Sequence, residues 1–269
     1  MDQRWWPEEG LAKRDAIAYY ERIAQVLLPH LRGRPFTFKR YPNGPRGPCF
    51  WLKDLPPEAP PWFRTAPQPA KSRGGASVRY ALIEDEPSLL WAADFGAIDL
   101  HVWSARADRP ARPDWAIFDL DPKGGDAIEA AHVLREALEA LGLDSYPRTS
   151  GHAGLHVLVP LARVHDSDQV RRFVAAVARA VHRARPRLGV AIDVKMNGHG
   201  QQFVSVYSLR PKTARICAPL AWDEVTPSLD PAGFGIAEVV RRVDELGDLH
   251  AGVLRGRQRL GPALRRFGG

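Results

Sequence analysis

The chain has 269 residues, of which 45% are hydrophobic and 26% charged, so it can form one or two packed units and is not a small disulfide-stapled fold. Only Cys49 and Cys217 are present, which excludes a cysteine-rich zinc site and favours a reducing cytoplasm. The net charge of +7 favours a polyanionic partner such as nucleic acid, and no apolar run approaches the ~20 residues that span a membrane. A basic surface that serves solubility alone is the alternative.

The first third of the chain predicts one helix and a loop-rich segment. Apolar residues recur at helical spacing from Asp15 to Pro29, which predicts an amphipathic helix closed by Pro29 and Gly33. Residues 33–75 are dense in Pro and Gly, which indicates short strands and turns. Basic and aromatic residues alternate in this segment: Phe36, Phe38, Lys39, Arg40, Tyr41, Arg46, Phe50, Trp51 and Lys53. The mixture suits a surface that holds phosphates and stacks bases, and the alternative is a loop whose aromatic side chains pack on the core.

The rest of the chain predicts helices on a sheet. Strands are expected from Trp115 and over 155–160, 190–194 and 203–207, and amphipathic helices over 126–141 and 167–185. Residues 197–200, Asn-Gly-His-Gly, predict a hairpin turn between the last two strands. The segment from His250 is a basic tail that contacts DNA or is simply solvated.

Asp119 and Asp121 are the first candidate catalytic residues. They lie two apart on a predicted strand, so both side chains leave one face, about 6 to 7 Å apart. Paired carboxylates favour a hard divalent cation, Mg²⁺ or Mn²⁺. Two such ions activate a primer 3′-hydroxyl and neutralise the leaving pyrophosphate. The alternative is that either aspartate only caps the following turn.

A turn of small residues, Thr149 to His156, predicts a seat for a triphosphate. The backbone N–H groups around Gly151, the Ser150 hydroxyl and the His156 imidazole can all donate to phosphate oxygens. His156 as a satisfied core histidine is the alternative. Asp193 ends an apolar strand, and we interpret it as a third metal ligand because a buried cluster of carboxylates needs a cation. Arg210 provides a forked cation for the triphosphate or, alternatively, a surface salt bridge.

Taken together, these segments resemble a known family, the polymerase domain of bacterial DNA ligase D in the archaeo-eukaryotic primase superfamily. The matching strings, in the family's order, are Phe38-Lys39-Arg40-Tyr41-Pro42-Asn43-Gly44, Leu100-His101-Val102-Trp103, Phe118-Asp119-Leu120-Asp121-Pro122, Thr149-Ser150-Gly151 with Gly154-Leu155-His156-Val157, and Tyr207-Ser208-Leu209-Arg210 leading to Pro219-Leu220-Ala221-Trp222-Asp223-Glu224. The resemblance spans nearly the whole chain.

The resemblance implies an α/β (α+β) fold in which an RNA-recognition-like catalytic sheet packs on a second α/β module. It implies a single primase-polymerase domain over 1–269, with an N-terminal DNA-contacting module over about 1–110 and a catalytic module over 111–269. Asp119, Asp121 and Asp193 are then the ligands of two Mn²⁺ or Mg²⁺ ions. Ser150, His156 and Arg210 contact the incoming nucleotide.

The same resemblance implies DNA contacts. Phe50 and Trp51 match a pair of aromatic residues that stack on template bases, and Lys13 matches a lysine in the pocket for a downstream 5′-phosphate. Arg40 and Lys53 are further candidates from the basic and aromatic segment. Family members fill gaps during end joining with NTPs or dNTPs, often prefer ribonucleotides, and some can prime. A nucleoid-associated cytoplasmic protein is the expectation.

Several departures from the family pattern modify these expectations. His152 and Ala153 replace a usual Gly and a usual Lys or Arg, so phosphate contacts at that turn are expected to differ. The second 5′-phosphate lysine falls at Gln3, which predicts weaker recognition of that phosphate. A Lys-x-Asp-Gly ligase signature is absent from the sequence, so the chain as given is not expected to seal a nick itself. The ligase is expected to be either a separate partner or a part of the protein outside this sequence, and a Ku-type end-binding protein is a further expected partner.

Three functions therefore compete. The leading one is a template-dependent polymerase or primase that acts on broken or gapped DNA. A non-catalytic DNA-end bridging module would use the basic and aromatic segment and the tail, and a metal-dependent phosphoesterase would use the same acids. Three carboxylates on a DNA-binding face repel phosphates unless metals are bound, which favours catalysis over bridging.

Overall fold

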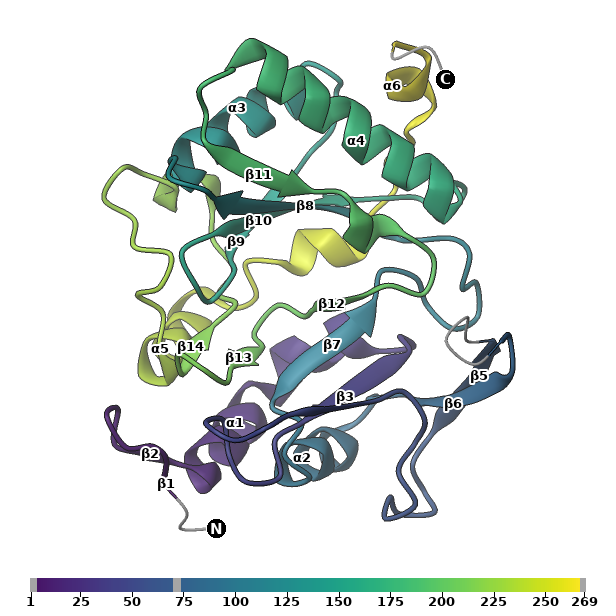
Figure 1. Ribbon diagram of the computed structural model, residues 1–269, viewed down its shortest axis with the longest axis vertical. Helices are drawn as coiled ribbons and strands as arrows, with labels where there is room; N and C mark the ends of the chain where they lie inside the picture. The colour runs from purple at the N-terminus through teal and green to yellow at the C-terminus, as the bar shows by residue number, and fades with distance from the viewer. Residues whose placement is uncertain (1–3, 70–73, 267–269) are drawn as a thin grey trace. The chain divides into compact units, whose positions relative to one another are not determined.

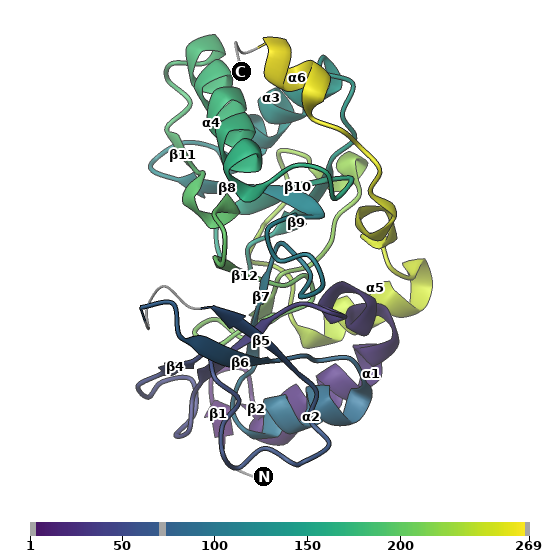
Figure 2. The same cartoon turned by 90° about the vertical axis from the view of Figure 1, so that its right-hand side faces the viewer.

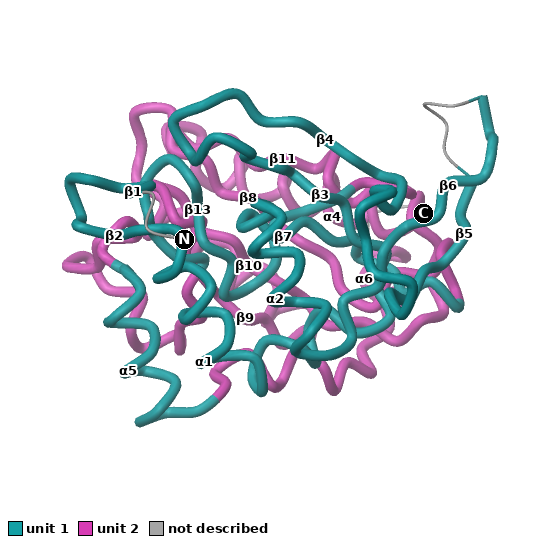
Figure 3. Tube along the Cα trace, turned by 90° about the horizontal axis from the view of Figure 1, so that it is seen from below, with its two compact units in different colours: residues 1–108, 202–217, 234–247 teal, residues 109–201, 218–233, 248–269 magenta. Residues whose placement is uncertain are grey.

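A computed structural model describes residues 4–69 and 74–266. It divides into two compact units (Figure 3). Unit 1 contains residues 1–108, 202–217 and 234–247, and unit 2 contains residues 109–201, 218–233 and 248–269. The first boundary lies near residue 110, but two later segments return to unit 1. Residues 202–204 pair with residues 101–103 of that unit, and the helix over 236–246 contacts its first helix. Within the described ranges, no helix is both long and apolar enough to cross a membrane.

Unit 2 is built on a four-stranded antiparallel sheet covered by two helices (Figure 1). Its elements are β8 (Trp115–Pro122), α3 (Ala127–Glu139), β9 (Tyr146–Thr149), β10 (Leu155–Pro160), α4 (Ser167–Ala184), β11 (Val190–Asp193), three short 3-10 helices, η2 (Lys195–Asn197), η3 (Trp222–Glu224) and η4 (Ala251–Arg255), and α6 (Gly261–Arg266). The strand order β11-β8-β10-β9 with a β-α-β-β-α-β chain order is that of a split βαβ, or RNA-recognition-like, sheet. The expected strand and helix types are confirmed in this unit, except after β11.

One face of the sheet in unit 2 is apolar and the other is polar. Phe118 of β8 packs edge to face against Phe173 of α4, with ring centroids 6.2 Å apart, so even-numbered residues of β8 face the helices. Asp126 caps α3 by accepting a hydrogen bond from the Ile128 amide at 2.7 Å. Asp119 and Asp121 therefore lie on the face opposite α3 and α4.

The predicted hairpin at residues 197–200 is wrong. The strand before it, β11, pairs with β8, whereas β12 pairs with β7 in another sheet. The residues between them begin with η2, whose Asn197 side chain accepts from the Ile117 amide at 2.9 Å and donates to the Ile117 carbonyl at 2.8 Å. The Asn197 side chain thus makes hydrogen bonds to β8 of the kind that a neighbouring strand would make. The local Asn-Gly pattern does not reveal this long-range contact.

Unit 1 is built on a six-stranded antiparallel sheet with α1 and α2 against one face (Figure 2). Its elements are β1 (Arg4–Trp6), β2 (Leu11–Ala12), α1 (Lys13–Leu31), β3 (Phe36–Arg40), β4 (Phe50–Leu52), β5 (Thr65–Pro69), β6 (Ser77–Ala81), α2 (Glu86–Asp94), β7 (Asp99–Trp103), β12 (Gln202–Val204), β13 (Leu209–Arg210), β14 (Arg215–Ile216) and α5 (Ile236–Leu246). The strand order is β12-β7-β3-β6-β5, and β4 also pairs with β3.

The first helix is longer than predicted. Pro29 lies inside the last turn of α1 and does not end it, because the helix continues to Leu31. The amide of Arg32 still donates to the Leu28 carbonyl, so only the hydrogen bond of Pro29 itself is lost at a helix end that frays anyway. Gly33 follows with a positive φ of 70°, as expected for a residue that closes a helix.

The aromatic residues of the basic and aromatic segment divide between the core and the surface. Phe36, Phe38 and Tyr41 are buried, and Phe38 packs against Trp91 of α2 with centroids 6.0 Å apart. The large side chains that remain exposed here include Phe50, at 53%, and Trp51, at 48%. The division follows the strands: Phe36 and Phe38 belong to the buried part of β3, whereas Phe50 and Trp51 belong to β4, which is exposed on both faces at these positions.

Candidate active site and nucleic-acid interface

Strand register aligns the predicted catalytic residues of unit 2 on one face. Asp119 of β8 is directly opposite His156 of β10 on one side and Asp193 of β11 on the other. Directly opposite residues have Cβ atoms about 4.5–5.5 Å apart and share a face of the sheet. Asp121, two residues further along β8, lies on the same face. All four side chains thus occupy the face that α3 and α4 leave uncovered.

Each of the three carboxylates has a close polar neighbour. Asp121 Oδ2 is 2.5 Å from Lys123 Nζ, both largely exposed, and Asp193 Oδ1 accepts from the Lys195 amide at 2.7 Å. Asp119 Oδ1 is 3.5 Å from His156 Nε2. The turn after β8 is held by the Gly189 carbonyl, which accepts from two amides of that turn. These two hydrogen bonds hold the turn after β8, which is the role that the alternative interpretation assigned to Asp119 or Asp121.

The carboxylates suit a hard divalent cation in chemistry, but they are not gathered into a closed ligand set. In the part of the chain that the structure describes, no group of three or more His, Cys, Asp or Glu side chains converges to hold a metal ion. Three carboxylates on one uncovered face are nevertheless the donors that Mg²⁺ and Mn²⁺ prefer. The exposed Asp121–Lys123 ion pair is weak, so a divalent cation can displace the lysine at small cost.

His156 is buried and oriented by an arginine. Its Nδ1 accepts a hydrogen bond from Arg148 Nε at 3.2 Å, and Arg148 is itself buried. An Nδ1 that accepts leaves the ring hydrogen on Nε2, which faces Asp119. His156 is buried, as the alternative interpretation of a core histidine expects. Its ring is nevertheless oriented so that the Nε2 donor lies beside Asp119.

The turn after β9 is organised by the Ser150 hydroxyl. Ser150 Oγ accepts from the amides of His152 and Gly154, both at 3.2 Å. Gly151 has a φ of 71°, and a Cβ on Gly154 would lie 2.5 Å from the Leu120 carbonyl oxygen of β8. Two of the amides expected to cradle a phosphate are therefore used within the turn.

Arg210 belongs to unit 1, where it pairs with a buried carboxylate. Arg210 Nη1 donates to Asp99 Oδ1 at 2.9 Å, and the Asp99 side chain has no exposed surface. Asp99 also accepts from Lys39 Nζ at 2.7 Å and lies 3.1 Å from His101 Nε2. Burial by itself raises the pKa of Asp99, but the adjacent His101, Arg210 and Lys39 outweigh it and hold that pKa well below its usual range. The salt bridge expected on the surface is therefore an internal one.

Two tyrosines of α1 fix the backbone that carries Arg210. Tyr20 Oη donates to the Ile98 carbonyl at 2.5 Å and accepts from the Leu209 amide at 2.9 Å. Tyr19 Oη donates to the carbonyl of Tyr207, a non-glycine residue with a φ of 62°. Burial raises the pKa of Tyr20, so its hydroxyl remains a neutral donor and acceptor. The strand β13 is thus fastened beside β7.

Phe50 and Trp51 lie on opposite faces of β4. Trp51 pairs with Lys39, and its ring is 5.2 Å from Lys39 Nζ and 4.8 Å from the His101 ring. Phe50 pairs with Arg40, whose guanidinium lies over the Phe95 ring at 3.9 Å. The aromatic pair predicted as one stacking platform therefore presents its rings to two surfaces. Lys53 follows β4 directly and is partly exposed.

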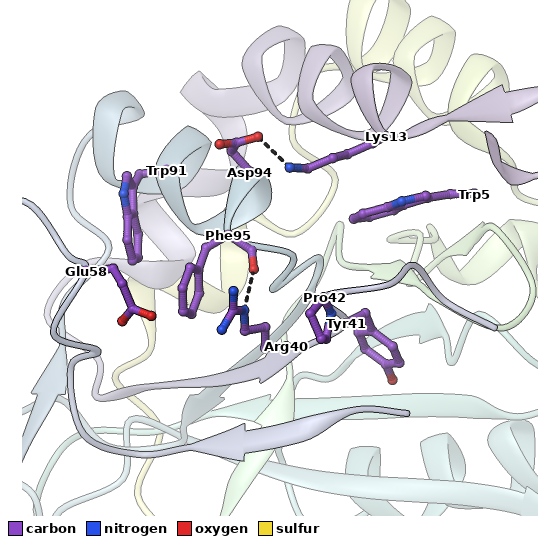
Figure 4. Close-up of a pocket in the computed structure, with 9 residues that line it drawn as sticks. All are labelled: Trp5, Lys13, Arg40, Tyr41, Pro42, Glu58, Trp91, Asp94 and Phe95. Atoms are coloured by element: carbon purple, nitrogen blue, oxygen red, sulfur yellow. Dashed lines mark hydrogen bonds and ion pairs between the residues drawn. The ribbon is translucent and has the colours of Figure 1, made fainter. Parts of the chain in front are cut away.

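Lys13 and Arg40 line one pocket of unit 1, with a volume of about 330 Å³ (Figure 4). Its lining residues are Trp5, Lys13, Arg40, Tyr41, Pro42, Glu58, Trp91, Asp94 and Phe95. Lys13 Nζ donates to Asp94 Oδ1 at 2.6 Å, and Arg40 Nε donates to the Phe95 carbonyl at 3.1 Å. Gln3, the position expected to weaken 5′-phosphate recognition, lies outside the described residues.

Some residues of these sites were missed by sequence reasoning. Asp99 and Arg148 are each buried and each orients a predicted site residue, and Asp94 faces Lys13. The signal for Asp99 was present, because a single acid inside the apolar run 97–102 has to find a cation when that run becomes a buried strand. Asp94 and Arg148 have no comparable signal, since their partners are distant in the chain.

Comparisons with known proteins identify the family of the chain. A model of the LigD primase-polymerase domain matches residues 12–250. The multifunctional non-homologous end joining protein LigD of Mycolicibacterium smegmatis is 34% identical over 93% of this chain and 35% of its own length. The bifunctional non-homologous end joining protein LigD of Bacillus subtilis is 30% identical over 92% of this chain and 42% of its own length. The chain thus spans about a third to two fifths of these relatives.

A solved structure shows the same fold. The polymerase domain from Mycobacterium tuberculosis ligase D, in complex with DNA, aligns with a TM-score of 0.86 and 31% sequence identity. The alignment covers 96% of this chain and 97% of that one. The expected archaeo-eukaryotic primase-type α/β fold is therefore confirmed.

Proposed function

Because the chain belongs to the LigD primase-polymerase domain family, we propose that it is a template-dependent polymerase or primase that adds NTPs or dNTPs to primer 3′ ends. Its substrate is broken or gapped DNA during end joining in the cytoplasm, and its enzyme class is nucleotidyltransferase. The single observation that supports this reaction best is the register that aligns Asp119 with His156 and Asp193 on the face of the sheet opposite α3 and α4.

In this proposal Asp119, Asp121 and Asp193 hold two Mn²⁺ or Mg²⁺ ions, which when bound activate the primer 3′-hydroxyl and neutralise the leaving pyrophosphate. Asp119 is central because both strands that flank β8 contribute a polar residue beside it. His156 directs its Nε2 hydrogen toward this edge while Arg148 holds the other ring nitrogen. The imidazole is thereby kept in the orientation that a phosphate oxygen requires of a donor.

The incoming nucleotide is proposed to contact Ser150, Gly151, His156 and Arg210. Ser150 Oγ fixes the turn by accepting from the amides of His152 and Gly154, which sets the shape of the backbone that the phosphates would approach. The positive φ of Gly151 lets the backbone approach the phosphates without a Cβ in the way. Arg210 supplies a permanent charge whose orientation Asp99 fixes.

The DNA contacts are proposed for Lys13, Arg40, Phe50, Trp51 and Lys53 of unit 1. Trp51 is half exposed and is supported from behind by Lys39 and His101, so it can stack on a base without losing its position. The pocket of Lys13 and Arg40 is proposed to take the 5′-phosphate of the downstream strand. A separate DNA ligase and a Ku-type end-binding protein are the proposed partners.

Primer extension tests the reaction. The protein is incubated with Mn²⁺ or Mg²⁺, with NTPs or dNTPs, and with primer-template DNA that carries a gap or an overhang, and the primer length is resolved on a gel. Longer primers are the expected result. Shorter DNA or hydrolysed nucleotide would instead indicate a phosphoesterase, and DNA binding with no change in either substrate would indicate a bridging module.

The pocket of unit 1 gives a second prediction. Lys13→Ala is expected to weaken binding of gapped DNA with a downstream 5′-phosphate by about 5- to 10-fold, because one charge-assisted contact is lost. Asp94→Asn is expected to strengthen the same binding, since Asp94 then no longer competes for the Lys13 ammonium. Fluorescence anisotropy with labelled DNA measures both.

The control for this prediction is identical DNA that lacks the 5′-phosphate. Neither variant is expected to change its affinity by more than about twofold, since only the phosphate contact is altered. Equal losses with both DNAs in the Lys13→Ala variant would mean that Lys13 contacts the DNA elsewhere.

A further inference from the structure

The fully buried carboxylate of Asp99 in unit 1 is linked to two proposed substrate contacts, directly to Arg210 and through Lys39 to Trp51. Asp99 accepts from Arg210 Nη1 through Oδ1, at 2.9 Å, and from Lys39 Nζ through Oδ2, at 2.7 Å. His101 Nε2 lies 3.1 Å from Oδ1 but without the alignment of a hydrogen bond. The two directional bonds therefore go to Lys39 and Arg210, one from each oxygen.

The burial of this group makes its contacts obligatory. A carboxylate with no exposed surface is strongly destabilising unless cations surround it, so the folded unit holds both basic side chains against it. The side chains of Lys39 and Arg210 each remain 18% exposed. Asp99 thus holds the Lys39 and Arg210 side chains from the interior of the unit, and part of each side chain stays accessible to substrate.

The same carboxylate is linked to the exposed tryptophan. Trp51, Lys39 and Asp99 are consecutive partners across β4, β3 and β7, so their side chains form one row on one face of the sheet. The Trp51 ring lies 5.2 Å from Lys39 Nζ, a cation–π contact. The position of the ring therefore depends on the position of the ammonium, which Asp99 determines.

We infer that Asp99 is a positioning residue shared by the nucleotide contact Arg210 and the base-stacking residue Trp51. This inference rests on the proposed function of those two residues. It predicts that a single substitution at Asp99, which contacts neither substrate, weakens the binding of both the nucleotide and the primer-template.

The test is Asp99→Asn, which keeps the shape of the side chain and removes its charge. Steady-state primer extension is expected to show a KM for the nucleotide raised about tenfold or more, and anisotropy a primer-template Kd raised about 3- to 10-fold. The matched control is Asp244→Asn, which breaks an exposed Asp–Arg pair of the same unit, 2.5 Å from Arg22. Both constants of the control are expected to stay within about twofold of the wild type.

A folded Asp99→Asn protein, verified by circular dichroism and melting, with either constant unchanged would overturn the shared role. A lower nucleotide KM would also overturn it, since the substitution would then have acted only through the loss of a negative charge. The two ideas fail differently: a wild-type protein that extends no primer contradicts the polymerase, while equilibrium binding of NTP and of primer-template to both proteins still tests Asp99.

Lys39→Met provides a second route if Asp99→Asn does not fold. Asp99 keeps its bond to Arg210 in this variant, whereas its ion pair with Lys39, and with it the link to Trp51, is lost. The expected result is a primer-template Kd raised about 3- to 10-fold with an unchanged nucleotide KM. An unchanged Kd would contradict the link between Asp99 and Trp51.

Discussion

Asp119→Ala is expected to lower the rate of primer extension by at least about a thousandfold, while the affinity for primer-template DNA stays the same or rises. The reason is the central position of Asp119, between His156 on β10 and Asp193 on β11. The substitution removes the carboxylate that lies between the two neighbouring strands, so extension is lost. The removal of one negative charge can only favour the binding of DNA, which is a polyanion. Gel-resolved extension and anisotropy measure the two quantities.

The control for this variant is Asp168→Ala, which removes an exposed carboxylate near the start of α4 in the same unit. Asp168 is paired only loosely with Arg171, three residues along the helix, at 3.2 Å. Extension by this control is expected within about twofold of the wild type. Residual extension above a few per cent in the Asp119→Ala protein would remove Asp119 from the metal ligands and leave Asp193 as the leading carboxylate.

The parts of the fold that could be predicted from the sequence are those with a clean local period. The strand from Trp115 and the helices that follow Asp126 and Asp166 have alternating or helical apolar patterns, and each is present. Their order then sets the split βαβ arrangement, which places Asp119, Asp121, His156 and Asp193 on one face. Sequence reasoning thus named these residues as candidates, and the strand register shows which of them are neighbours.

The parts that could not be predicted depend on long-range pairing. Asn197 looked like a turn residue because Asn-Gly is a strong local signal, but its side chain bonds to Ile117, 80 residues away. Residues 202–217 looked like a continuation of the second half, but β12 pairs with β7. No local sequence pattern indicates either of these long-range partners. Arg210 was therefore expected in the catalytic module, but it is found in unit 1.

The turn after β9 in unit 2 gives the second large effect, through Gly154. Gly154→Ala is expected to destabilise the protein by about 1–3 kcal/mol and lower its melting temperature by roughly 3–10 °C. The added Cβ would lie 2.5 Å from the Leu120 carbonyl oxygen, a backbone atom that cannot turn aside. Because Gly154 also donates to Ser150 Oγ, movement of the turn is expected to raise the KM for the nucleotide in the protein that still folds.

Gly261→Ala is the matched control for Gly154→Ala. It lies in α6 of the same unit, where the nearest contact of an added Cβ is the end of the flexible Arg265 side chain at 3.6 Å. Alanine is also favoured over glycine in a helix, so the control is expected to melt at or slightly above the wild-type temperature. Differential scanning calorimetry compares the three proteins. Equal melting of both variants would show that β8 can shift away from the turn, and the nucleotide KM would then show whether the turn must be rigid to hold a phosphate.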